Sequence, residues 1–196
     1  MKTFTKWLMV GMAGLALGAA SAQMAGMNMS GMGTKSSDAL VKLSGKAYNI
    51  AWMSQMLEHH KGALVMAQDC VKVCERAEVK KAAQTIINDQ SKEIKQLEGW
   101  LKSWYGVKPD VKQMALMRGD MAQMMMETKS GMAPMAGMSM PIDQSFLEGM
   151  IVHHEHAVMM GKDAVKKASR AELKKFAQGV ITAQSSEIKQ FKAWLK

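Results

Sequence analysis

Residues 56–66 read MLEHHKGALVM, and residues 150–160, which lie 94 positions later, read MIVHHEHAVMM. The two stretches contain all five histidines of the chain. Residues three and four apart lie on one face of an α-helix, so each stretch places methionine and histidine side chains next to one another. Imidazole and thioether groups together form a borderline-to-soft ligand set that suits copper. The pattern therefore predicts two related helices that carry candidate metal ligands.

The similarity between the two halves extends well beyond these stretches. Aligned without a gap, residues 52–102 and 146–196 share 25 identities in 51 positions. Apolar residues recur at three- and four-residue steps, which is typical of amphipathic helices. We expect two long helices in each copy, at residues 49–74 and 75–104 and at residues 143–168 and 171–196. Neither helical hairpin can bury its apolar stripe alone, so the sequence predicts an all-α protein in which two duplicated hairpins form a four-helix bundle.

The N-terminus has the form of a secretory signal peptide. Lys2 and Lys6 precede an apolar run at residues 7–20, and residues 20–22 supply an A-x-A cleavage site. The run is too short for a comfortable membrane span. We therefore expect cleavage after Ala22 and a periplasmic or secreted protein with no stable membrane span after cleavage.

These patterns divide the chain into five segments. They are a signal peptide at 1–22, a flexible Met/Gly-rich tail at 23–45, a first hairpin repeat at 46–108, a Met-rich linker at 109–141 and a second hairpin repeat at 142–196. Within the linker, residues 110–127 predict an extra short helix whose methionines share a face, with packing as their favoured role. Asn49 and Asp143 are the expected N-caps of the first helix in each copy.

Charge and motifs exclude several classes of function. The formal net charge of the whole chain is +9, and it falls to +7 when the two signal-peptide lysines are removed. The remaining basic residues are scattered along helical patterns, so no nucleic-acid partner is expected. The sequence has no nucleophile elbow, P-loop or dinucleotide fingerprint, and it lacks the Glu-x-x-His spacing of di-iron bundles. We therefore expect a metal-binding protein rather than an enzyme.

The candidate metal ligands form a main group and a weaker group. The main group is His59, His60, Met56, Met66, His153, His154, His156, Met150, Met159 and Met160. Additional candidates are Cys70 and Cys74, the linker residues Met132, Met135, Met138 and Met140, and the tail residues Met24, Met27, Met29 and Met32. His156 has no counterpart in the first copy, where Gly62 stands, so we expect the second site to be the stronger one.

Each group of candidates also has an alternative role. A buried histidine commonly bonds a carboxylate or carbonyl group in a protein core. Cys70 and Cys74 lie one helical turn apart, and they fit thiolate ligands, a disulfide or small core residues; we favour the ligand role. Four polar residues on or beside the apolar stripes are candidates to orient a histidine ring across the bundle, with a surface Glu–Lys pair as the alternative for the carboxylates. These residues are Gln90, Glu93, Gln184 and Glu187.

The second copy also resembles a known family. Its pattern is Asp143-x-x-Phe146-x-x-x-Met150-x-x-His153-His154-x-x-Ala157-x-x-Met160, followed by Gln184-x-x-Glu187-Ile188 and Trp194. The first copy repeats it with Asn49, Trp52, Met56, His59, His60, Ala63, Met66, Gln90, Glu93, Ile94 and Trp100. This pattern resembles the bacterial domain-of-unknown-function family numbered 305. The resemblance covers about residues 46–196, and it implies an exported, ferritin-like four-helix bundle of the copper-binding and copper-resistance type.

Three hypotheses for function follow. The first is an exported protein that binds Cu(I), with Ag(I) or Cu(II) as alternatives, and acts as a metal buffer or chaperone in copper tolerance. Its candidate partners are a periplasmic metal exporter or a cuproprotein. The second is a copper-dependent oxidoreductase that uses the three histidines of the second copy. The third is a metal-free bundle that binds a protein partner or responds to acid through its histidines.

Overall fold

The computed structural model describes residues 34–131 and 141–196, without the side chains of residues 127–131. Within these ranges the ordered elements are all helices: α1 (Lys35–Val41), α2 (Gly45–Val73), α3 (Ala77–Tyr105), α4 (Val111–Gly131), α5 (Ile142–Lys167) and α6 (Ala171–Trp194). No helix in the described ranges is long and apolar enough to span a membrane. The predicted signal peptide lies outside the described residues.

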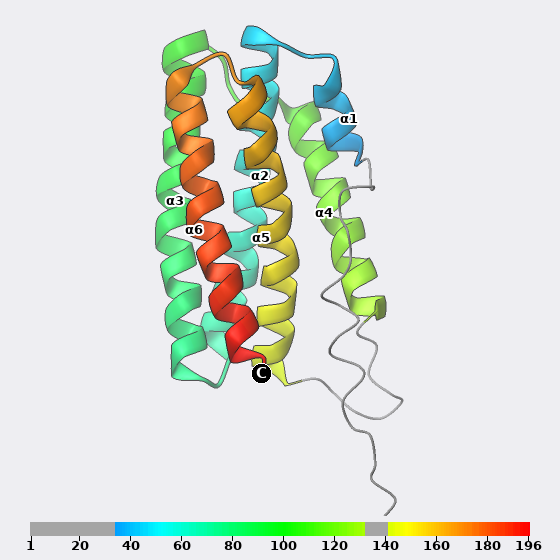
Figure 1. Cartoon of the computed structure of the whole chain (residues 1–196), viewed down its shortest axis with the longest axis vertical. Helices are drawn as coiled ribbons and strands as arrows, with labels where there is room; N and C mark the ends of the chain where they lie inside the picture. The colour runs from blue at the N-terminus through cyan, green and yellow to red at the C-terminus, as the bar shows by residue number, and fades with distance from the viewer. Residues whose placement is uncertain (1–33, 132–140) are drawn as a thin grey trace, which may run out of the picture. The chain divides into compact units, whose positions relative to one another are not determined.

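The four long helices form the predicted bundle. Helix α2 packs along α3, α5 packs along α6, and the two hairpins meet chiefly through α2 and α5 (Figure 1). On another side of the bundle, the ring centroids of Trp100 in α3 and Phe176 in α6 lie 5.6 Å apart. The all-α bundle predicted from the duplication is therefore confirmed.

Helices α1 and α4 cover one side of α2. Helix α4 packs mainly on α2, and α1 packs on α4 and α2 (Figure 1). As a result, residues 51–57 of α2 are all buried, although a helix at the edge of a bundle would expose some of them. The linker helix has 21 residues and is longer than predicted, and its Met117 and Met124 are buried.

Helix α1 corrects the prediction of a flexible tail at 23–45, because residues 35–41 of that segment are helical. Thr34 and Ser37 form a reciprocal capping box at its start. The Ser36 backbone N–H donates a buried 2.7 Å hydrogen bond to the carboxylate of Asp120 in α4, and Leu40 is buried. The sequence did not predict this helix, because contacts with distant residues stabilise it and it is too short to show a repeating apolar pattern.

The apolar core is divided into two clusters by a layer of polar side chains. One cluster contains Trp52, Leu97 and Leu173, and the other contains Leu147 and Phe191. Between the two clusters, the buried polar residues of the four long helices are histidines and glutamines, and two half-buried glutamates lie beside them. We call them the polar layer: His59, His60, Gln90, Glu93, His153, His154, His156, Gln184 and Glu187.

Asn49 and Asp143 do not cap their own helices as predicted. The chain becomes helical before each of them, at Gly45 and Ile142, and both side chains are buried. Each instead bonds the connection inside the other hairpin. The Asp143 carboxylate accepts from the backbone N–H groups of Glu75 and Arg76, at 3.1–3.4 Å, where α3 begins.

The Asn49 amide makes the equivalent contact in the other direction. Its Oδ1 accepts from the Ser169 backbone N–H at 3.2 Å, and its Nδ2 donates to Ser169 Oγ at 2.8 Å, just before α6. The N–H groups of Glu75, Arg76 and Ser169 lie just before the helical residues of α3 and α6, so they need partners from outside these helices. A carboxylate near a helix N-terminus also interacts favourably with the helix dipole. Each hairpin therefore holds the connection inside the other.

Replacing Asp143 with alanine should reveal the strength of this contact. The D143A variant leaves two backbone donors without their acceptor, so we expect its free energy of unfolding to fall by about 1–3 kcal/mol. Urea unfolding followed by circular dichroism measures the change. The exposed Ser145 on the same helix provides the matched control S145A, which should unfold like the wild type. Equal free energies of unfolding for D143A and S145A would show that the Asp143 contact does not stabilise the protein.

Candidate metal centre

All five histidine side chains lie in the polar layer and are buried. Their exposed fractions are 0% for His59, His60, His153 and His154, and 1% for His156. Helices α2 and α5 supply them from facing positions, and α3 and α6 supply the glutamine and glutamate residues around them. The duplicated motif therefore converges on one region of the bundle instead of forming two distant sites.

Three of the imidazole rings are in close contact. The ring centroids of His59 and His153 lie 3.8 Å apart across the α2–α5 interface. The His156 ring stacks on His59 with a centroid separation of 5.2 Å and an angle of 23° between the planes. These three histidines form the centre of the layer.

The ring nitrogens of the central histidines lack partners within the described residues. Neither nitrogen of His59 or His153 makes a hydrogen bond there, and Nδ1 of His156 makes none. A buried polar group without a partner costs about 1–3 kcal/mol, so native proteins rarely leave several together. Neutral imidazole nitrogens are good ligands for copper, and a bound ion would supply the missing partner. The donor set fits a metal.

The other two histidines contact carboxylates. His60 Nε2 lies 2.9 Å from Glu93 Oε2, and His154 Nε2 lies 2.8 Å from Glu187 Oε2. Both contacts are short in distance but lack hydrogen-bond alignment, and Nδ1 of each ring has no hydrogen bond within the described residues. A carboxylate beside one nitrogen of a metal-binding histidine orients the ring and makes it a better donor. Glu93 and Glu187 thus lie beside histidine rings of another helix, where the predicted orienting role requires them.

Gln90 and Gln184 are also buried in the layer, each 3% exposed. Among the described residues, the Nε2 and Oε1 atoms of Gln90 make no hydrogen bond, and the same holds for Oε1 of Gln184. The predicted contact from these amides to a histidine ring is therefore not formed in this structure.

Methionines border the polar layer on both sides. Met56 and Met160 belong to one apolar cluster, whereas Met150 belongs to the other and Met66 packs against it. Met56 and Met150 are fully buried, so their thioethers lie in the core within one helical turn of the histidines. Gly149 leaves room for this arrangement, because a Cβ there would lie 3.2 Å from the Met66 methyl carbon.

The two copies differ most at Gly62 and its counterpart His156. A Cβ added to Gly62 would lie 3.4 Å from His153 Nε2, so position 62 borders the central histidine pair. Only the second copy supplies a third imidazole. The centre is therefore asymmetric although the backbone is duplicated.

The described part of the chain contains no group of three or more His, Cys, Asp and Glu side chains already arranged to hold a metal ion. A metal here must therefore use methionine sulfur together with imidazole, or must draw the rings together on binding. Thioether ligands favour Cu(I) over harder cations.

The prediction of cysteine ligands is wrong. Cys70 and Cys74 form a disulfide with a Cα–Cα distance of 4.8 Å, and both are buried. Two cysteines four apart on a regular helix have poorly directed Cβ atoms. Cys74 escapes this restriction because α2 ends at Val73 and Cys74 has extended backbone angles, φ −59° and ψ 149°. The pair is thus unavailable as thiolates.

The remaining weak candidates, the tail methionines 24, 27, 29 and 32 and the linker methionines 132, 135, 138 and 140, lie outside the described residues. Sequence reasoning missed Asp120, which is buried in α4 and interacts electrostatically with His156. Its position in a helix with no clear apolar stripe offered no signal of this contact.

Burial lowers the pKa of the central histidines. The pKa values of His59 and His153 lie well below 6.5, first because of burial and then because neighbouring histidines disfavour a further positive charge; a backbone contact with His59 opposes the shift at His153. Burial also lowers the pKa of His156 to about 4, although the Asp120 carboxylate opposes the shift. These rings are therefore neutral near pH 7, with lone pairs free for a metal.

Comparison with known proteins adds to this geometry. The model of the family described as "Domain of unknown function (DUF305)" matches residues 1–101 and 74–195. CopM in its Cu(I)-bound form is 29% identical, with a TM-score of 0.58 over 74% of this chain and 94% of that one. CopM in its Cu(II)-bound form is 30% identical, with the same coverage and TM-score. No match was found among curated proteins.

A DUF305 fragment from Deinococcus radiodurans shares the fold. Its TM-score is 0.60 at 23% identity, over 78% of this chain and 98% of that one.

The lowered histidine pKa values predict a stability that depends on pH. Between the unfolded pKa of about 6.5 and the folded value, the unfolded chain binds more protons, so the metal-free protein should lose stability as the pH falls. For His156, with its pKa of about 4, the full loss amounts to about 3 kcal/mol.

Urea unfolding of the metal-free protein at about pH 7.5 and about pH 5 measures this loss. More than half of the loss that His156 causes should have occurred at about pH 5. The H156Q variant keeps a neutral polar side chain and should show a smaller difference between the two conditions. An unchanged difference in H156Q would show that His156 is not a source of the pH dependence.

Proposed function

The chain belongs to the DUF305 family, and from this premise we propose that it is an exported copper-binding protein whose polar layer holds Cu(I). The observation that carries the proposal is the set of buried imidazole nitrogens of His59 and His153, which have no hydrogen-bond partner in residues 34–131 and 141–196. Solved forms of CopM, a protein similar in sequence and fold, contain Cu(I), Cu(II) or Ag. Export is supported by the signal-peptide pattern of residues 1–22.

The ligands fit Cu(I) better than a harder ion. His59 and His153 face each other across α2 and α5, and methionines border them in both apolar clusters. Imidazole with thioether satisfies Cu(I) and Ag(I), whereas Mg²⁺ and Ca²⁺ require oxygen ligands that the centre of the layer does not present. Glu93 and Glu187 would orient the outer histidines rather than bind the ion themselves.

The role that we propose is that of a buffer or chaperone, with no turnover. The central histidines are fully buried, so an ion among them would be shielded from solvent and from other reactants. Such a site favours storage and transfer to a partner, for which a periplasmic metal exporter or a cuproprotein is our proposal.

Anaerobic titration of the chain from residue 23 with Cu(I), against a competing chelator, tests the proposal. We expect the H59Q/H153Q variant to lose affinity by at least about tenfold, because even the loss of an outer-shell partner costs that much in known metal sites. The M56L/M150L variant should also bind more weakly, while M53L, which alters another fully buried methionine of α2, should bind like the wild type. Circular dichroism confirms that each variant is folded.

Other outcomes of the titration contradict parts of the proposal. Full affinity in H59Q/H153Q would show that the His59–His153 pair does not hold the ion. No competition by the wild type would reject copper binding altogether and favour a metal-free bundle.

The absence of turnover has its own test. The Cu(I)-loaded protein, supplied with a reductant and dioxygen or peroxide, should consume the oxidant no faster than the H59Q/H153Q variant under the same conditions. Multiple turnovers by the wild type alone would instead identify a copper-dependent oxidoreductase.

A further inference from the structure

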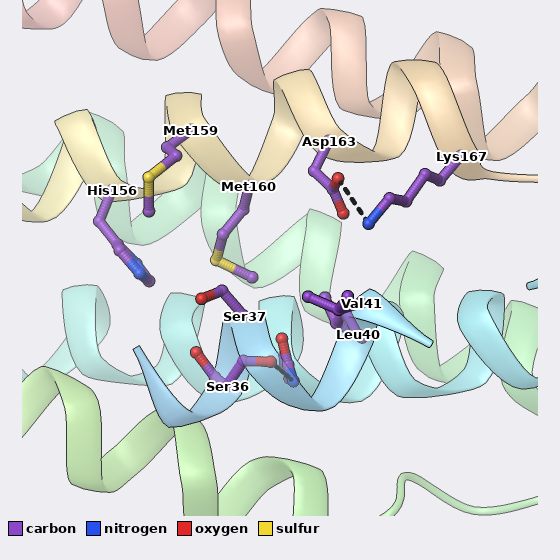
Figure 2. A pocket seen from close by; sticks show the side chains of 10 residues that line it. Ser36, Ser37, Leu40, Val41, His156, Met159, Met160, Asp163 and Lys167 are labelled. Atoms are coloured by element: carbon purple, nitrogen blue, oxygen red, sulfur yellow. Dashed lines mark hydrogen bonds and ion pairs between the residues drawn. The ribbon is translucent and has the colours of Figure 1, made fainter. Parts of the chain in front are cut away.

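A pocket of about 210 Å³ lies between α1, α2 and α5, on the side of the polar layer where His156 stands. Figure 2 shows His156, Met159 and Met160 extending from α5 toward α1, which forms the opposite wall. Sequence reasoning did not find this pocket, because it exists only where α1 covers the bundle.

The soft and borderline donors in the pocket are one imidazole and two thioethers. Met159 and Met160 follow His156 by three and four residues, so all three lie on one face of α5. His156 Nδ1 is buried without a hydrogen bond among the described residues. Met159 is half-buried and Met160 is 7% exposed, so both reach the pocket from the edge of the core.

The charged groups of the pocket already have partners. The Asp163 carboxylate accepts a 2.7 Å hydrogen bond from the Tyr48 hydroxyl group and pairs with Lys167 at 3.2 Å. Figure 2 shows this ion pair at the end of the pocket away from His156. The unengaged donors are therefore nitrogen and sulfur, which suit a soft monovalent cation rather than a hard divalent one.

The first copy offers no equivalent site. Gly62 and Val65 stand where His156 and Met159 stand in the second copy, and Val65 is 60% exposed. Helix α1 is held to α2 by the 2.8 Å hydrogen bond that the Gln55 amide group donates to the Ser36 carbonyl group, and it forms the wall of the pocket that His156 lines. The pocket is thus a feature of this chain's asymmetry, not of the duplicated motif.

The pocket also touches the centre of the polar layer. The His156 ring that lines the pocket stacks on His59 at 5.2 Å. A ligand bound to His156 would therefore lie one ring away from the central pair.

We propose that the pocket between α1 and α5 is a second binding site for Cu(I) or Ag(I), formed by His156, Met159 and Met160 and separate from the His59–His153 pair. The site rests on the proposed function, since it takes the same class of ion. It differs in its accessibility, because half-buried Met159 lines a pocket whereas His59 and His153 are enclosed.

Methionine-methyl NMR during titration with Ag(I), a redox-inert soft cation, tests the site in the chain from residue 23. The M159L and M160L spectra assign the two methyl signals, and M53L assigns a fully buried control. We expect the Met159 and Met160 signals to shift in the same titration step while the Met53 signal stays in place. The H156Q variant should abolish both shifts, and M159L should weaken the step seen at Met160 by at least about tenfold.

The outcomes separate this site from the proposed function. Shifts at Met56 and Met150 without shifts at Met159 and Met160 would overturn the pocket site and leave copper binding in the layer intact. No shift at any methionine would overturn both. The M159L variant changes a half-buried side chain to one of similar volume, so the test remains decisive even where H156Q fails to fold.

Discussion

The structure of this bundle depends on the burial of five imidazole rings between two apolar clusters. The clusters supply the hydrophobic stabilisation of the four long helices, and the polar layer interrupts both of them at the same level. Unpartnered ring nitrogens at that level disfavour folding by an amount that the surrounding packing must offset. The proposed soft metal ion would supply partners for these nitrogens and would account for the residue types present.

The rest of the fold fixes this layer in position. Glu93 and Glu187 restrain the outer histidines from α3 and α6, and Gly62 lies against the His153 ring. The methionines on either side bring polarizable sulfur to the layer without adding a charge that would have to be buried. The centre is therefore neutral near pH 7, and a monovalent ion would be the largest charge in it.

Much of this arrangement was predictable from the sequence. Helical periodicity and the internal duplication predicted the four long helices, and the same duplication predicted that His59 and His153 would play matching parts. Other features depend on contacts between residues far apart in the chain, which periodicity does not report. Helix α1 depends on Asp120, the disulfide depends on how α2 ends at Val73, and the pocket depends on α1 itself. The side chains of Asn49 and Asp143 have the chemistry of helix caps, but each bonds the connection inside the other hairpin instead of the start of its own helix.

The reciprocal contacts of Asn49 and Asp143 between the hairpins bear on how the duplicated chain arose. Asn49 and Asp143 occupy equivalent positions in the two copies, and each bonds the connection inside the other copy. A contact in which residue i of one unit meets residue j of its twin, and the reverse, is the signature of a twofold symmetric dimer. The arrangement is what would remain if an ancestral single hairpin had paired with an identical chain before its gene was duplicated and fused. A fused chain no longer requires identical halves, and His156 at the position equivalent to Gly62 is one such difference.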